Sequence, residues 1–210
     1  MKHLCFVAGL LPLLLIACAQ GTASVGGTIP DLPTGAEVRS AAVPGGAPVY
    51  LSLLTGGGES LYQTTAAAGS TVTAVDPGAW KSKFTGRTVA AETLIPAGAT
   101  NTSISPAGAQ VLLLHWTMWQ DTNTNGALDD GEALALLTHD RVAYSDKALS
   151  LSFQTAAPNM VQTWTLKAGW SRAAHYVYRP DDGKNQFQRS LESTLPQRYE
   201  LHIPTPITSM

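Results

Sequence analysis

The residues best suited to chemistry stand together in a short polar stretch, Asp121 to Glu132, which reads DTNTNGALDDGE. Side chains with carboxylate or amide oxygens recur through it at Asp121, Asn123, Asn125, Asp129 and Glu132. Oxygen donors of this kind bind hard cations such as calcium, whereas zinc and copper sites use Cys or His, and the stretch contains neither. Without a cation the converging carboxylates would repel one another. The spacing therefore predicts a loop that holds a divalent cation.

The stretch resembles the calcium loop of EF-hand proteins. That loop takes ligands from positions 1, 3, 5, 7, 9 and 12 and needs Gly at position 6, where Gly126 stands here. The resemblance implies calcium as the cofactor, with Ala127 contributing only its backbone carbonyl. It implies the ligand set Asp121, Asn123, Asn125, Ala127, Asp129 and Glu132. The alternative is a polar hairpin tip, because Asp, Asn, Gly and Thr also favour turns.

The segments beside this loop favour strands over the two helices of an EF-hand. In the preceding segment, 110–119, apolar residues stand on both alternating faces, which is typical of a buried strand. The loop is therefore more similar to the calcium loops of β-sandwich modules in bacterial surface proteins, with the string W-x-D-x-N-x-N-G-x-x-D-x-G-E. That string is matched from Trp119 to Glu132. We expect a calcium loop between strands, without the opening motion of a calcium sensor.

The N-terminus has the anatomy of a secretory signal: a short basic start is followed by an apolar run from Leu4 to Ile16. The run ends in Leu15-Ile16-Ala17-Cys18, which resembles a bacterial lipobox. The resemblance implies cleavage after residue 17, a lipid on Cys18 and anchoring in the cell envelope. With Ala rather than Asp at position 19, it implies the outer membrane if the cell has one. An ordinary signal peptide or an uncleaved anchor is the alternative.

The domain organisation follows from these segments. We predict a signal peptide over residues 1–17, a lipidated Cys and flexible tether over 18–27, and a β-sandwich over 28–210, with a possible subdivision near 95–106. The two cysteines, Cys5 and Cys18, both lie in the targeting region, so the mature chain would form no internal disulfide.

Composition and patterning predict an all-β protein, specifically an antiparallel β-sandwich. Short runs of alternating hydrophobicity are divided by Gly, Pro, Asp and Asn, as in sandwiches and barrels. Residues 141–145 and 149–153 are expected to pair as a hairpin, 95–106 to be a crossing loop and 185–193 to allow a helix. The last predicted strand alternates Tyr199, Leu201 and Ile203 with polar residues.

Composition also limits the function. The formal net charge is −2 and no basic patch interleaves with aromatics, which argues against nucleic-acid binding. No catalytic motif is present, so we predict a non-enzymatic envelope protein that uses calcium structurally and has an envelope protein as its partner. One alternative is a carbohydrate-binding module, which needs an exposed row among Trp116, Trp119, Trp164 and Trp170. The other is an enzyme with a dispersed active site, which needs a deep pocket holding close titratable groups. Histidines, His115 among them, are interpreted as structural. The oligomeric state stays open.

Overall fold

The structure is a computed structural model, and it describes residues 29–30, 35–76, 84, 86–180, 183 and 186–204. The predicted signal peptide (1–17), Cys18 and the tether (18–27) lie outside the described residues. In the part of the chain that is described, no helix combines the length and the apolar character needed to cross a membrane.

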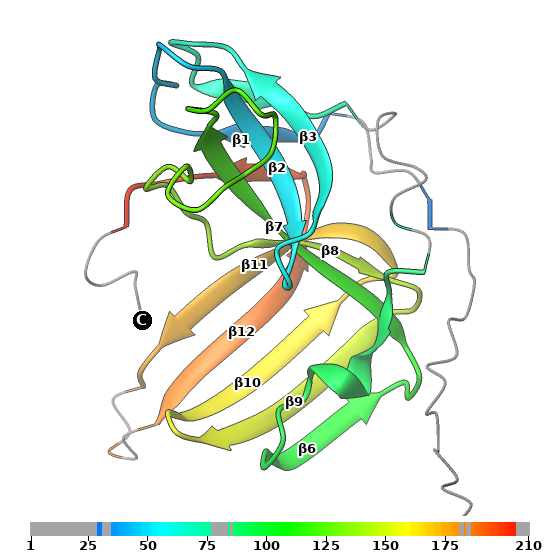
Figure 1. Ribbon diagram of the computed structural model, residues 1–210. Helices are drawn as coiled ribbons and strands as arrows, with labels where there is room; N and C mark the ends of the chain where they lie inside the picture. The colour runs from blue at the N-terminus through cyan, green and yellow to red at the C-terminus, as the bar shows by residue number, and fades with distance from the viewer. Residues whose placement is uncertain are drawn as a thin grey trace, which may run out of the picture.

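The chain folds into β-strands arranged as a sandwich, as the alternating sequence predicts (Figure 1). The strands of the first half are β1 (Glu37–Arg39), β2 (Val49–Thr55), β3 (Ser60–Ala66), β4 (Val72–Ala74), β5 (Val89–Ala90), β6 (Thr100–Ser105) and β7 (Gln110–Gln120). A short 3-10 helix, η2, spans Ala91–Leu94. The strands of the second half are β8 (Arg141–Ser145), β9 (Leu149–Ala156), β10 (Asn159–Leu166), β11 (Gly169–Tyr178), β12 (Phe187–Thr194) and β13 (Arg198–Glu200).

Two sheets are formed by the described residues. The larger has the order β3-β2-β7-β8-β11-β12-β10-β9-β6, with β5 attached to β7, and the smaller has the order β13-β1-β4. Most neighbours are antiparallel, but β10 and β12 are parallel, and so are β1 and β13. The predicted all-β sandwich is therefore confirmed, with two parallel pairs that the sequence did not predict. Parallel pairing is possible because neither pair is joined by a tight turn: β11 lies between β10 and β12 in the chain, and β1 and β13 are the first and last strands.

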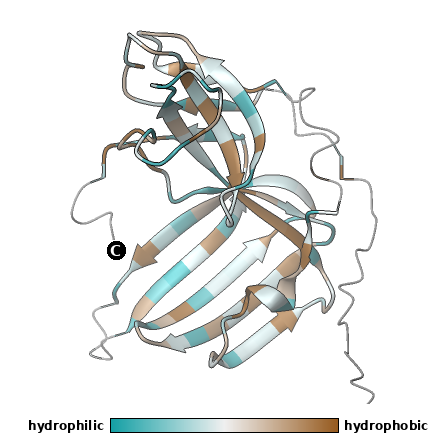
Figure 2. Cartoon of the chain, in the orientation of Figure 1, coloured by the Kyte–Doolittle hydropathy of each residue, from teal (hydrophilic) through white to brown (hydrophobic). Residues whose placement is uncertain are grey.

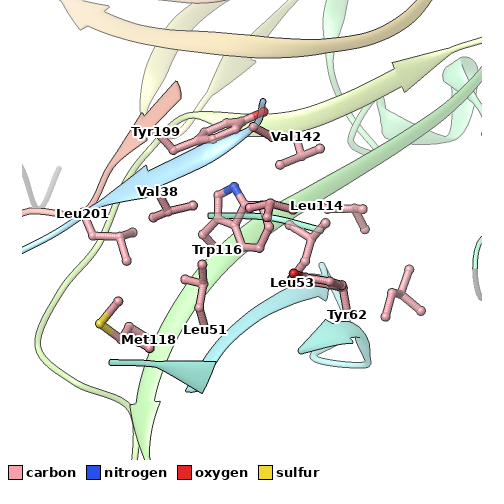
Figure 3. Close-up of a cluster of buried hydrophobic side chains, with 14 of the residues drawn as sticks. Val38, Leu51, Leu53, Tyr62, Leu114, Trp116, Met118, Val142, Tyr199 and Leu201 are labelled. Carbon is pink, nitrogen blue, oxygen red and sulfur yellow. The ribbon is translucent and has the colours of Figure 1, made fainter. Parts of the chain in front are cut away.

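The first hydrophobic core lies where the small sheet packs on the β2, β3 and β7 end of the large sheet. Figure 3 shows Val38 and Tyr199 from the small sheet facing Leu51, Leu53 and Trp116 from the large one. All five side chains are buried. Ring contacts reinforce the packing, because the rings of Trp116 and Tyr199 lie 5.9 Å apart edge-to-face. This core joins the C-terminal strand to the first strands of the chain.

The second core lies on the opposite face of the large sheet, toward its β9, β10 and β12 end, and η2 contributes to it. Strands β7, β8 and β11 belong to both cores because successive side chains of a strand point to opposite faces. On β8, Val142 packs in the first core and Ala143 in the second. Figure 1 shows β7 running from one half of the molecule into the other. Figure 2 shows apolar and polar residues interspersed along these strands.

The structure corrects several local expectations. The predicted crossing loop at 95–106 contains strand β6, and the region where a helix was allowed is strand β12. Strands β8 and β9 do not pair: β8 lies between β7 and β11, and β9 lies between β10 and β6. Pairing partners are decided by which faces can be buried together, and a short connection between two strands does not determine them.

The most regular alternations were predicted correctly. Strand β7 covers the whole apolar run before the polar loop. In the last predicted strand Tyr199 and Leu201 are buried, but Ile203 is 66% exposed because β13 ends at Glu200. On β11, Tyr176 and Tyr178 are exposed to solvent.

Candidate functional site

The 121–132 loop follows directly from the end of β7 and is closed at its base like a hairpin. Trp119 forms a β-bridge with Ala133, and the Gln120 N–H donates to the Glu132 carbonyl at 3.0 Å. The Asp121 N–H donates to the carbonyl of Pro48, just before β2. The loop is thus held between consecutive extended segments, as the sequence predicts, and its base rests on the first core.

The first and last carboxylates of the loop, Asp121 and Glu132, are buried, with 2% and 7% of their surface exposed. The Asp121 carboxylate accepts hydrogen bonds from the N–H groups of Asn125 at 3.1 Å and Gly126 at 2.9 Å. One Glu132 oxygen accepts from the N–H and hydroxyl of Thr122, both at 2.8 Å. The other accepts from the Asp129 N–H at 3.1 Å. The loop backbone therefore curls around two carboxylates.

The remaining predicted ligands interact with one another at the exposed side of the loop. The amide nitrogens of Asn123 and Asn125 both donate to Asp129 Oδ2, at 2.8 and 2.6 Å. The partially positive amide hydrogens thus contact the Asp129 carboxylate, which the calcium hypothesis assigns to the cation. Among the described residues, no group of three or more His, Cys, Asp and Glu side chains is close enough to hold a metal. The Asp129 carboxylate is therefore held by the two asparagine amides.

The backbone of the loop turns where the sequence predicts a sharp turn. Gly126 has a φ of +73°, a left-handed conformation that glycine adopts without the steric cost of a Cβ atom. Thr124, two residues earlier, also has a positive φ of 62°. The N–H of Ala127 donates to Asn125 Oδ1 at 2.8 Å. These turns bring the two ends of the loop together.

The hydrogen bonds of the loop favour the charged form of Glu132. Burial is the largest single influence and raises the pKa of this carboxyl, but the hydrogen bonds from Thr122 and from the Asp129 N–H together lower it, and the net pKa lies below its ordinary value of 4.5. This ionised carboxylate stabilises the fold above that value, and the stabilisation is lost as pH falls through the lowered pKa. Glu132 is therefore an anion at neutral pH.

The four tryptophans named in the sequence analysis do not form the exposed row that a carbohydrate-binding module would need. Trp116, Trp119 and Trp170 are buried, and Trp164 is half-buried with its ring 6.1 Å from that of Phe153. Trp119 also donates to the buried hydroxyl of Ser52 at 2.8 Å. Three of these side chains are therefore buried, and the fourth packs with part of its surface against Phe153.

The structure reveals a second feature that sequence reasoning missed. A cavity of about 1110 Å³ lies beside β7, and His115 and Arg141 are among its lining residues. Further along the same sheet, Arg189 contacts His175. In the sequence each histidine stands alone and was interpreted as structural. No pattern of neighbouring residues in the sequence indicates that these four residues, each on a different strand, lie on one face of the sheet.

No family model matches the chain, and no curated protein and no solved structure matches it.

Proposed function

We propose that this protein is an exported, lipid-anchored component of the cell envelope whose β-sandwich is stabilised by calcium in the 121–132 loop. The observation that carries the calcium part is the burial of Asp121 and Glu132 in one short loop. None of the ion pairs found among the described residues includes either carboxylate. Burying charged groups without an opposite charge is costly, and a divalent cation would offset that cost.

The loop fits calcium better than a softer metal. Its side chains offer oxygen donors at short spacing, and loading would exchange the amide contacts on Asp129 for oxygen contacts to the ion. The site lies at the end of β7, a strand shared by both cores, so an ion there would stabilise the whole sandwich through mass action. The role that we propose for calcium is therefore structural.

The membrane part of the proposal depends on the lipobox-like sequence ending at Cys18. Lipid chains on that residue would hold the protein on the membrane, because each buried methylene contributes about 0.8 kcal/mol and two or more chains bind firmly. The sandwich would stand off the membrane on the small residues of 18–27. A structural or interaction role with another envelope protein follows from this position.

The first prediction concerns thermal stability with and without calcium. With an affinity of about 10⁻⁴ M and about 10 mM free calcium, the ion would contribute roughly 2.7 kcal/mol. For a chain of this length that corresponds to an increase in Tm of roughly 5–10 °C, measured by circular dichroism in calcium against a chelator.

Two loop variants and a matched control make the test specific. Asp121→Asn and Glu132→Gln should abolish the calcium-dependent increase, because each removes a buried anionic oxygen donor. Asp130→Asn removes an exposed carboxylate from the same loop at a position outside the predicted ligand set, and it should keep the increase. Equal Tm values in calcium and chelator for the unaltered protein would refute the calcium proposal.

A further inference from the structure

Four basic side chains lie on one face of four neighbouring strands of the large sheet. They are His115 on β7, Arg141 on β8, His175 on β11 and Arg189 on β12. Arg141 pairs with Ala173, and Arg189 pairs with Val177. Because alternate residues share a face, Ala173, His175 and Val177 point the same way. The β7–β8 register, continued two residues beyond Leu113 and Ala143, brings His115 opposite Arg141. This face is the one that carries the second core.

The side chains of this basic row contact one another and the backbone. Arg189 Nε donates to His175 Nε2 at 2.6 Å, so that imidazole nitrogen is an acceptor. The rings of His139 and His175 lie 5.3 Å apart. Arg141 donates to backbone carbonyls, the shortest of these contacts being 2.9 Å to His139. The nearby carboxylate of Asp140 accepts a hydrogen bond from the backbone N–H of His175.

Neither arginine of the row has a carboxylate partner among the ion pairs of the described residues. Asp140 instead forms its ion pair with Arg172, at 3.7 Å. The pKa of Arg141 is lowered by burial and by the charge of Arg189, against an opposing effect of Asp140. Burial likewise lowers the pKa of Arg189. Two half-buried cations therefore repel each other on one face, an arrangement that a bound anion would relieve.

The cavity beside β7 begins at one end of this row. Its volume of about 1110 Å³ is slightly above the range, roughly 300–1,000 Å³, of sites for small molecules. Leu94, Val111 and Leu113 give it apolar walls. Arg87 on another wall is already neutralised by a two-pronged ion pair with Glu59, both contacts being 2.6 Å. Arg141 is thus the cation of the lining that forms no ion pair with a carboxylate among the described residues.

We propose that this cavity binds an amphipathic anion, with its apolar body against Leu94 and Leu113 and its oxyanion group at Arg141 and His115. A guanidinium group is suited to this role because its planar donors match carboxylate and phosphate oxygens. The half-buried His115 has its pKa lowered by burial and then by Arg141, so the imidazole is neutral at pH 7 and its N–H is a hydrogen-bond donor. The site uses no residue of the 121–132 loop and does not depend on calcium.

Calorimetric titration tests the proposal with dodecanoate, dodecyl phosphate and dodecanol as probes. The protein is the full chain carrying Cys18→Ser, so that no acyl group of its own competes for the cavity. Dodecanoate or dodecyl phosphate should bind with a stoichiometry of one, and whichever binds more tightly identifies the preferred oxyanion. Dodecanol, which has the same apolar chain without the charge, should bind at least tenfold more weakly.

Two variants locate the binding site. Arg141→Gln should weaken binding of the anionic probe tenfold or more while leaving the dodecanol affinity unchanged. Thr93→Trp introduces a large ring at an exposed lining residue and leaves Arg141 in place. It should weaken the binding of all three probes because the ring occupies part of the cavity. Arg39→Gln, on β1 of the small sheet, is the control and should bind like the unaltered chain. Absence of binding, equal affinities for anion and alcohol, or binding unaffected by Thr93→Trp would overturn the proposal.

Discussion

At the scale of single residues, His175 lies in an environment that disfavours its charged form. Its pKa is lowered to about 4, first by burial and then by the positive charges of Arg189, His139 and Arg141. The backbone N–H of His175 donates to the Asp140 carboxylate, and its ring nitrogen Nε2 accepts from Arg189. The imidazole is therefore neutral at pH 7 and serves as an acceptor between cationic neighbours.

This environment predicts a loss of stability in mild acid. Between the ordinary value of 6.5 and the lowered pKa of about 4, the unfolded chain binds a proton at His175 that the folded chain does not. The free energy of unfolding should therefore fall as pH decreases through this window, by at most about 3 kcal/mol. Urea unfolding at pH 7 and pH 4.5 would measure it.

The variant His175→Asn should show a smaller decrease over the same window, because the titrating group is removed. His202→Asn removes an imidazole at the β-bridge with Leu137 and provides the control. A pH dependence that is identical in His175→Asn and the unaltered protein would contradict the assignment. The stability that ionised Glu132 contributes is lost only below pH 4.5, the ordinary pKa of this carboxyl. The effect of Glu132 is therefore separate from that of His175 at pH 4.5 and above.

At the scale of elements, strands β7, β8 and β11 are decisive because each packs into both cores. Leu114 on β7 is fully buried in the first core, and Leu151 on β9 is 1% exposed in the second. A substitution that leaves a cavity in one core is expected to destabilise the other core as well, because the two cores share these strands. The predicted subdivision near 95–106 falls at β6 and would place β7 in the second unit, yet β7 also pairs with β2 of the first half.

We therefore predict one cooperative unfolding transition. Leu114→Ala and Leu151→Ala should each lower its midpoint, at a cost of about 2–5 kcal/mol for a buried Leu. Leu195→Ala, at a side chain that is 66% exposed, should change the free energy of unfolding by less than about 0.5 kcal/mol. Urea unfolding followed by tryptophan fluorescence and by far-UV circular dichroism would test this. Two phases, each sensitive to one of the leucine variants, would show that the cores fold independently.

At the scale of the whole molecule, the proposed function places a β-sandwich on a membrane through an N-terminal lipid. The variant Cys18→Ser removes the thiol that would carry the lipid. We expect the unaltered protein to take up labelled palmitate and to fractionate with membranes, whereas the variant does neither. Cys5→Ser, within the predicted signal peptide, should leave both properties intact. Membrane fractionation of Cys18→Ser at the level of the unaltered protein would contradict lipid anchoring.

The sequence by itself determined the features that depend on neighbouring residues. Alternation predicted β7 and the buried Tyr199 and Leu201, because side-chain direction in a strand has a period of two residues. The turn at Gly126 was also predicted, because it depends on a loop of only twelve residues. Calcium binding itself stays a prediction.

The tertiary structure decided which distant segments meet. It placed β8 between β7 and β11 instead of beside β9, and it made residues 100–105 and 187–194 into strands through their partners. It assembled the basic row from strands far apart along the chain. Pairing depends on which faces bury apolar surface together, a property of the whole chain that no local pattern contains.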